Sequence, residues 1–252
     1  MSTISRRKLI TTGLLAAAGG TGLGVAAMLA RRYGLIPPDA GVPYGAGETL
    51  TYAAQRLLTR HSRAQEFARN QISKDPFANP VDPLGAEFQR LKEGGFAGWR
   101  LAVDGMAASP RSFSLEEIKS FPSSSQITLI ACEEGWSYIA EWTGVPLGHI
   151  LNLVGALPQA RYVVYRSFQP DWWDSIDMAD ALHPQTLLAT GMNGAELPVP
   201  FGGPLRMRVP RQLGYKNVKY ITRLTLTDSL KHFGKGLGSA APEGGYAWYA
   251  GI

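Results

Sequence analysis

The pattern of apolar and polar positions separates a short N-terminal segment from a longer mixed region. An apolar stretch rich in Gly and Ala covers residues 9–30, with Arg6 and Arg7 before it and Arg31 and Arg32 after it. Paired arginines ahead of a mildly hydrophobic segment predict a twin-arginine export signal and therefore a periplasmic or other extracytoplasmic location. A membrane anchor is the alternative, because the 22 residues from 9 to 30 are enough to span a bilayer. No clear Ala-x-Ala cleavage site precedes Arg31, so both interpretations stay open.

The remaining chain divides into a linker and one folded region. Residues 1–32 form the N-terminal signal or anchor, residues 33–47 are rich in Gly and Pro and predict a linker, and residues 48–252 form the folded region. Apolar residues at nearly helical spacing predict an amphipathic helix over 48–70. Residues 71–98 contain several prolines and are expected to be mostly irregular.

Short alternating segments replace the helical spacing from residue 99 onwards. Ser114 and Glu117 form a capping-box pattern, and Asn193-Gly194 is a typical hairpin turn. The expected strands are 99–103, 126–131, 161–168, 186–192, 196–199, 205–210 and 218–227, and the expected helices are 114–120 and 146–154. This order predicts an α+β fold with mixed sheets, flanking helices and long loops.

Composition narrows the range of functions. A length of 252 residues fits one sizeable domain with an N-terminal appendage. The net charge is +5, but several of the positive charges flank the N-terminal apolar stretch. No Lys/Arg run is suited to a nucleic-acid track, so no nucleic-acid partner is expected. The single cysteine excludes an intramolecular disulfide, a CxxC metal site and a CxxCH haem attachment, so redox chemistry would need a cofactor or a partner.

Cys132 is a candidate functional residue because it stands at the end of the expected strand 126–131. Two carboxylates and a glycine follow it, so the chain turns at this point. A strand end that opens into a turn is a common place for a ligand or a nucleophile. A buried, small hydrophobic role is the alternative for a lone cysteine. No Cys–His pair follows from the spacing, so nothing in the sequence supports a nucleophile.

A basic cluster surrounds a Gly-Pro turn in the C-terminal half. Arginine offers a planar fork for phosphate, lysine offers a point charge, and neighbouring glycines let backbone amides approach an anion. A solvated strand face is the alternative, and the residues alone do not decide between the two. The cluster consists of Arg206, Arg208, Arg211, Lys216 and Lys219 around residues 201–204.

Four ordered blocks resemble the molybdopterin-dependent enzymes of the sulfite-oxidase fold family. The stretch from Cys132 resembles the family pattern C-x-E-G-W-S followed by W-x-G-V-P-L. The resemblance spans residues 53–252 and is strongest to the small, exported, single-domain members, which include periplasmic methionine sulfoxide reductases. The blocks are 132–147, 192–198, 202–206 and 214–220.

The resemblance implies roles for individual residues. Cys132 would be the thiolate ligand of molybdenum in a molybdopterin cofactor, and tungsten stays an alternative metal. Arg69 would face the metal and hold an anionic substrate, with Asn70 beside the cofactor. Ser167 would contribute a hydroxyl group to the cofactor. The pterin phosphate would be held by Arg206, Lys216 and Lys219, with backbone groups of Asn217 and Val218.

Two departures from the family pattern refine this expectation. Phe201 stands where relatives carry His or Asn, so one polar contact to the cofactor is missing. Glu133-Glu134-Gly135-Trp136 follows the cysteine, where many sulfite oxidases carry G-N-R-R. Two acids in place of arginines disfavour the sulfite dianion and favour a neutral sulfoxide.

These observations predict an enzyme that moves one oxygen atom to or from a small substrate, with sulfoxide reduction favoured. The chain has no haem or iron–sulfur motif, so a membrane haem protein or a soluble cytochrome is the expected electron partner. Sulfite oxidation anchored by Arg69 is one alternative. A cofactor-free, membrane-tethered binding protein is the other, motivated by Phe201. The chain is too short for an additional dimerisation domain, so a monomer is expected.

Overall fold

The computed structural model describes residues 28–30, 33–79 and 84–252. Arg6, Arg7 and almost all of the predicted signal or anchor lie outside these residues. Within the part that is described, no helix has both the length and the apolar character needed to cross a membrane. The chain forms two compact units, Met1–Thr59 and Arg60–Ile252.

The first unit contains helix α3, Gly45–Leu58, which begins earlier and ends much earlier than the predicted helix 48–70. Thr59 ends the helix because its hydroxyl donates to the carbonyl of Gln55 at 2.8 Å, which competes with further helical bonds. Residues beyond it are extended. Phe67 donates its N–H to the carbonyl of Ile127, so pairing with a distant strand prevails over the local helical spacing.

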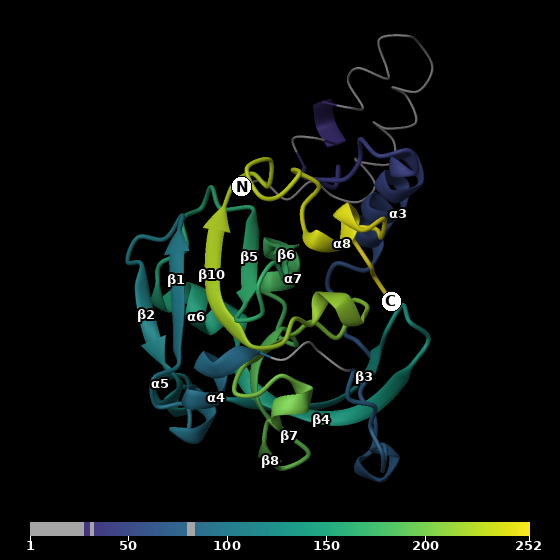
Figure 1. Ribbon diagram of the computed structural model, residues 1–252. Helices are drawn as coiled ribbons and strands as arrows, with labels where there is room; N and C mark the ends of the chain where they lie inside the picture. The colour runs from purple at the N-terminus through teal and green to yellow at the C-terminus, as the bar shows by residue number, and fades with distance from the viewer. Residues whose placement is uncertain (1–27, 31–32, 80–83) are drawn as a thin grey trace, which may run out of the picture. The chain divides into compact units, whose positions relative to one another are not determined.

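The second unit starts at Arg60 and contains two sheets with short helices (Figure 1). The strands are β1 Arg100–Gly105, β2 Arg111–Ser114, β3 Ser124–Ala131, β4 Ser137–Pro146, β5 Tyr162–Ser167, β6 Trp173–Asp177, β7 Leu187–Met192, β8 Ala195–Glu196, β9 Arg206–Arg208 and β10 Ile221–Thr227. The helices are α4 Gly85–Glu93, α5 Leu115–Ser120, α6 Leu147–Leu153, α7 Met178–Ala181 and α8 Ala240–Glu243, with the 3-10 turns η1 Arg69–Gln71, η2 Val199–Phe201 and η3 Gly214–Lys216. The predicted α+β fold with mixed sheets is confirmed.

The two sheets have different strand arrangements. The first has the order β2-β1-β10-β5-β6, in which β1 and β10 run parallel and the other neighbours run antiparallel. The second has the order β3-β4-β7-β8, with β9 also paired to β7. The turn after β3 and the segment between β9 and β10 both border the candidate site described below.

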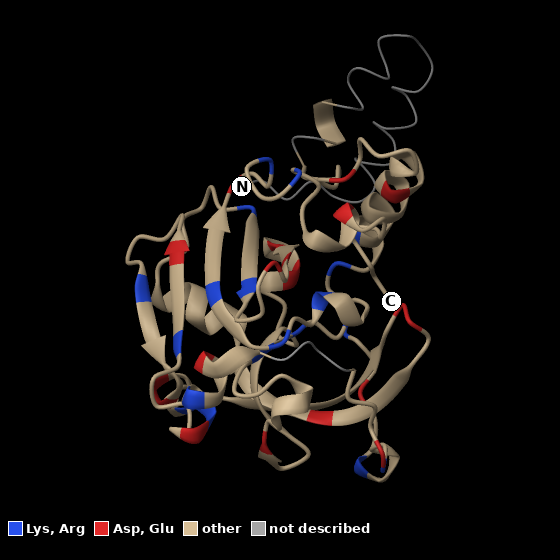
Figure 2. Ribbon diagram, in the orientation of Figure 1, with Lys and Arg blue, Asp and Glu red and all other residues tan. Residues whose placement is uncertain are grey.

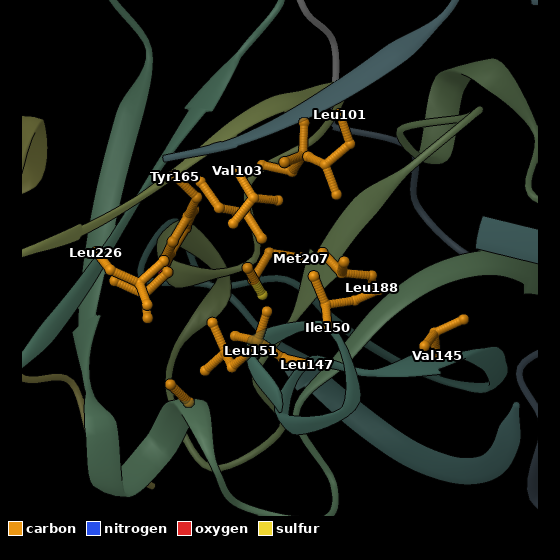
Figure 3. Close-up of a cluster of buried hydrophobic side chains, with 14 of the residues drawn as sticks. Leu101, Val103, Val145, Leu147, Ile150, Leu151, Tyr165, Leu188, Met207 and Leu226 are labelled. Carbon is orange, nitrogen blue, oxygen red and sulfur yellow. The ribbon is translucent and has the colours of Figure 1, made fainter. Parts of the chain in front are cut away.

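The main hydrophobic core lies between the first sheet, helix α6 and strands β7 and β9 (Figure 3). Leu101 of β1, Ile150 of α6 and Met207 of β9 are fully buried in it. Burial of each such side chain contributes roughly 1.5–3 kcal/mol to folding. The core therefore fixes β9, the strand that carries two of the basic residues singled out in the sequence.

Local sequence signals predicted several elements correctly, and longer-range pairing explains the omissions. The Ser114 hydroxyl accepts from the N–H of Glu117 at 3.1 Å, which confirms the predicted capping box of α5. Asn193 and Gly194 both have positive φ in the predicted hairpin turn between β7 and β8. Helix α4 lies inside the segment predicted to be irregular, and β2, β4 and β6 were not predicted. These strands depend on their sheet neighbours more than on local alternation.

Candidate functional site

A cavity of about 490 Å³ is formed by the turn after β3, the turn between β5 and β6, and the segment between β9 and β10. Five residues predicted from the sequence line it, namely Cys132, Arg206, Asn217, Val218 and Lys219. The other lining residues are Asn79, Glu133, Glu134, Trp136, Gln169, Trp172, Gly214 and Tyr215. The volume lies within the usual range for cofactor and ligand pockets.

Cys132 occupies a tight turn at the end of β3. Its N–H donates to the carbonyl of Trp136 at 2.9 Å, and its carbonyl accepts from the N–H of Gly135 at 3.1 Å. Gly135 has a φ of +92°, which a residue with a side chain rarely adopts. The thiol donates to the carboxylate of Glu133 at 3.0 Å. Burial, together with the neighbouring carboxylates, raises the pKa of Cys132 to about 12, so the free thiol is protonated at neutral pH.

Gly214 forms the opposite wall of the cavity beside the cysteine. A Cβ placed on Gly214 would lie 3.2 Å from the Cα, the Cβ and the Sγ of Cys132. This distance is shorter than ordinary carbon–sulfur contact, so the close approach of the two segments needs a glycine. Gly214 therefore packs directly against the Cys132 side chain.

Replacing Gly214 with alanine should displace the Cys132 sulfur by a few tenths of an ångström. We expect a loss of stability of about 1–3 kcal/mol, because the added methyl group overpacks the contact. The cofactor content of the purified protein should fall as well. Gly148→Ala in α6 is the control, since the nearest atom to its added Cβ lies at 3.7 Å. Full cofactor content in Gly214→Ala would contradict the close fit.

Arg206 and Lys219 bring positive charge to the cavity. Arg206 donates to the carbonyls of Phe201 and Asn217, both at 2.7 Å. Lys219 donates to the carbonyls of Asn79 and Pro200, also both at 2.7 Å. Burial and the proximity of Arg206 lower the pKa of Lys219 to about 8. Within the described ranges neither cation forms an ion pair with a carboxylate, so this part of the cavity favours an anionic group.

Acidic and aromatic side chains surround the cysteine end of the cavity. The indole N–H of Trp136 donates to the carboxylate of Glu134 at 2.7 Å, which fixes that carboxylate beside the turn. Phe77 packs against Trp136 with ring centroids 5.3 Å apart. Trp172, which is 45% exposed, lies at the other side of the lining. Figure 2 shows basic positions along the segment that crosses between the two sheets.

Lys216 lies outside the cavity, in contrast to its predicted role. Its ammonium group is fully buried, donates to the carboxylate of Asp174 at 2.6 Å and donates to the carbonyl of Ser175 at 3.0 Å. These contacts indicate a structural role for Lys216 in the described structure. Its predicted contact with the phosphate stays a prediction.

Arg69, Asn70 and Ser167 are also absent from the cavity lining. Arg69 makes a two-point contact with Glu141, at 2.7 and 2.9 Å, and its side chain is 70% exposed. Asn70 is exposed. Ser167 donates to the carbonyl of Lys219 at 2.9 Å, so it supports a lining residue without lining the cavity itself. The structure therefore does not bring Arg69 to the cysteine.

Several lining residues were not singled out from the sequence as site residues. Gly214 and Tyr215 belong to the block 214–220, so the family resemblance could have indicated them. Asn79 and Gln169 carry no local signal, because their position depends on the packing of distant segments. Phe201, the noted departure from the family pattern, does not line the cavity. The backbone carbonyl of Phe201 accepts a hydrogen bond from Arg206, so Phe201 makes a polar contact to a lining residue through its backbone.

Comparisons with known proteins place these observations in a family. Residues 90–232 match the family described as "Oxidoreductase molybdopterin binding domain". A protein of Azospira oryzae, named putative protein-methionine-sulfoxide reductase subunit YedZ1, is 40% identical over 161 residues, which cover 64% of this chain and 59% of that protein. The protein-methionine-sulfoxide reductase catalytic subunit MsrP of Xanthomonas axonopodis pv. citri is 35% identical over 147 residues, covering 52% and 46%. The chain thus spans about half the length of these curated relatives.

A solved structure supports the fold. The sulfane dehydrogenase SoxCD from Paracoccus pantotrophus matches with a TM-score of 0.51 and 24% identity, over 53% of this chain and 39% of that chain. This likeness bears on the fold alone. Because the family match covers more than half of the chain and contains both Cys132 and the basic segment of the cavity, the protein belongs to the oxidoreductase family with a molybdopterin-binding domain, as the resemblance predicted.

Proposed function

We propose that the protein is a molybdenum-dependent oxidoreductase that removes the oxygen atom from a small sulfoxide. The observation that carries this proposal is that Cys132, Arg206 and Lys219 line the same cavity, and that neither cation forms an ion pair within the described residues. The reaction takes up two electrons and two protons and releases a thioether and one water. The electrons come from a separate partner, because the sequence has no haem or iron–sulfur motif.

The residues of the cavity fit a molybdopterin. Gly214 leaves room beside the Cys132 sulfur that a single methyl group would fill. No group of three or more His, Cys, Asp or Glu side chains within the described residues could hold a metal by itself. A metal held mainly by sulfur atoms of the pterin and completed by one thiolate suits this arrangement. Arg206 and Lys219 supply the positive charge that a pterin phosphate requires.

Each part of the cavity would then have a defined task. The bound cofactor supplies the oxygen-atom transfer and the exchange of electrons. Cys132 would hold the metal, and the turn closed by Gly135 would orient its sulfur. Arg206 and Lys219 would bind the phosphate, while Ser167 holds the Lys219 backbone in place. Trp136 and Trp172 would border the substrate and limit the access of water.

The charges near the cysteine favour a neutral sulfoxide over sulfite. Glu133 and Glu134 line the cavity next to the Cys132 sulfur, and neither forms an ion pair within the described parts of the chain. They would repel a sulfite dianion. Arg69 is the cation that the sulfite alternative requires, and it is engaged with Glu141 outside the cavity. The names of the two curated relatives, both protein-methionine-sulfoxide reductases, also support sulfoxide reduction.

Removing the two carboxylates should make the cavity more tolerant of anions. We expect the double variant Glu133→Gln/Glu134→Gln to raise kcat/KM for sulfite oxidation roughly tenfold relative to that for sulfoxide reduction, which corresponds to about 1.4 kcal/mol. Both activities are measured with artificial electron carriers. Glu116→Gln on α5, an exposed acid that does not line the cavity, is the control. An unchanged ratio would show that these charges do not select the substrate.

The proposed activity is tested directly with the exported, cofactor-loaded protein. A reduced dye should be oxidised in the presence of methionine sulfoxide, and the protein should contain about one molybdenum and one pterin per chain. Elemental analysis also distinguishes molybdenum from tungsten. Sulfite oxidation that exceeds sulfoxide reduction would favour the alternative activity. Purified protein without metal or pterin, matured with its export machinery intact, would leave only the cofactor-free binding function.

We also propose export by the twin-arginine route and electron exchange with a membrane haem protein or a soluble cytochrome. Export of a folded protein suits an enzyme that receives its cofactor in the cytoplasm. Replacing Arg6 and Arg7 with lysine should leave loaded protein in the cytoplasm, as measured by cell fractionation. Unchanged amounts of periplasmic or membrane-attached protein would exclude this route.

A further inference from the structure

Two arginines on β9 are buried side by side without an acidic partner. Arg206 and Arg208 are 3% and 0% exposed, and both side chains project from the same side of the strand because they are two positions apart. Their guanidinium carbons lie 5.1 and 5.4 Å from the ring centroid of Trp142. Neither forms an ion pair with any carboxylate in residues 28–30, 33–79 and 84–252. The two neighbouring guanidinium groups therefore form a local concentration of buried positive charge.

Arg208 does not line the cavity, yet it directly holds a residue that does. One terminal nitrogen donates to the side-chain oxygen of Asn217 at 2.7 Å. The other donates to the hydroxyl of Thr128 at 3.1 Å and to the carbonyl of Leu129 at 2.5 Å. The third nitrogen, Nε, is buried without a hydrogen-bond partner. Arg208 thus links β3, the strand that leads to Cys132, with the segment that forms the opposite wall.

The side chain of Asn217 helps to fix residues 214–219, the segment between β9 and β10 that lines the cavity. Its side-chain oxygen also accepts from the N–H of Val209 at 2.8 Å, and its side-chain nitrogen donates to the carbonyl of Leu213 at 3.0 Å. Its main-chain carbonyl accepts from Arg206 at 2.7 Å. The Asn217 side chain, which Arg208 holds, is therefore one of the anchors of residues 214–219, a segment that includes five lining residues of the cavity.

Keeping Arg208 charged in the protein interior costs free energy when no anion is nearby. Burial, and then the like charge of Arg206, lower the pKa of Arg208 to about 9. Trp142 offsets part of this cost, since an aromatic face attracts a cation. Buried charges in proteins are usually paired with an opposite charge, so an anion bound nearby would lower this cost. Lys219 and Arg206, which lie in the cavity itself, add to the same positive field.

We propose that Arg208 is a positioning residue for the anionic end of the molybdopterin: it fixes residues 214–219 through Asn217, and its buried charge is balanced when the phosphate binds. This inference rests on cofactor binding in the proposed function, but not on the identity of the substrate. It assigns a task to Arg208, a residue for which the family resemblance implied no role.

The test compares cofactor retention in the full, exported chain of the wild type and two variants. Arg208→Lys keeps the charge, and Arg208→Gln keeps a polar group of similar length without the charge. Molybdenum and pterin per chain are measured after purification and during prolonged dialysis, and thermal unfolding is recorded in parallel. We expect Arg208→Gln to lose cofactor about tenfold faster than the wild type, and Arg208→Lys to restore most of the retention.

Arg211→Gln is the matched control, because Arg211 is a buried arginine that pairs with Asp180 at 3.3 Å. It should lower the melting temperature without releasing cofactor from the folded protein. Wild-type retention in Arg208→Gln, or equal losses in the lysine and glutamine variants, would overturn the proposal. If Arg208→Gln does not fold, Asn217→Asp places a carboxylate against Arg208 with little change of shape. It should also speed cofactor loss, and wild-type retention in this variant would overturn the proposal equally. A wild-type protein without cofactor would instead contradict the proposed function.

Discussion

Replacing Cys132 with serine should abolish sulfoxide reduction while leaving the fold intact. Serine is nearly the same size and can keep the hydrogen bond to Glu133, which the thiol makes at 3.0 Å. An alcohol oxygen is a harder and far less acidic ligand than a thiol, so it does not replace a soft thiolate on the metal. Replacing a residue that hydrogen-bonds to a metal ligand typically lowers metal affinity or activity by roughly 10–100-fold. Replacing the ligand itself should lower the activity by more than this.

The measurement combines turnover, metal content and unfolding. Cys132→Ser should unfold within a few degrees of the wild type, because the substitution removes little buried area. Cys132→Ala should lose the metal ligand and the activity in the same way. It also loses the hydrogen bond to Glu133. Because Cys132 is the only cysteine of the chain, no other thiol can take its place. Full turnover in both variants would mean that the metal needs no protein sulfur.

The second large effect is expected at Lys216 and concerns stability. Its ammonium group and the Asp174 carboxylate are both nearly inaccessible and lie 2.6 Å apart. Replacing Lys216 with methionine leaves a buried carboxylate without its cation, and burial already raises the pKa of Asp174. Removing one partner of such a pair should lower the free energy of unfolding by about 3–5 kcal/mol.

Denaturant unfolding at neutral pH measures this loss. Lys119→Met is the control, because Lys119 pairs with Glu196 on the surface, and such a pair contributes only about 0–1 kcal/mol. The double variant Lys216→Met/Asp174→Leu should recover part of the stability, since no unpaired charge remains buried. A loss below about 1 kcal/mol for Lys216→Met would show that the pair is not a structural anchor.

The fold class and the cysteine were predictable because their signals are local. Strand β3 alternates between buried and more accessible positions up to its end, so the sequence could place Cys132 at a strand end. The Gly-Pro turn and the basic residues beyond it left an anion site and a solvated strand face both open, and in the structure Arg206 and Lys219 line the cavity. Family resemblance supplied the identity of the cofactor, which no spacing of residues could have given.

The directions of long side chains were not predictable in the same way. Lys216 and Lys219 are three positions apart, and continued 3-10 helix would place them on the same side. The 3-10 helix ends at Lys216, and Asn217 leaves the helical conformation with φ −98° and ψ 59°, so the two lysine side chains point to different places. Arg69 is drawn to Glu141, a partner 72 positions away that only the pairing of β3 with β4 brings near.

The strand order of the first sheet has a consequence for biosynthesis. β10, the last strand in the sequence, lies between β1 and β5, which the ribosome makes much earlier. Until residues 221–227 have left the ribosome, the edges of these two strands have no partner, and the walls of the cavity are not joined. Contacts between such distant parts of a chain form late and slowly. We therefore expect a chain that ends before residue 221 to lack a complete cavity, so that cofactor loading follows the synthesis of β10.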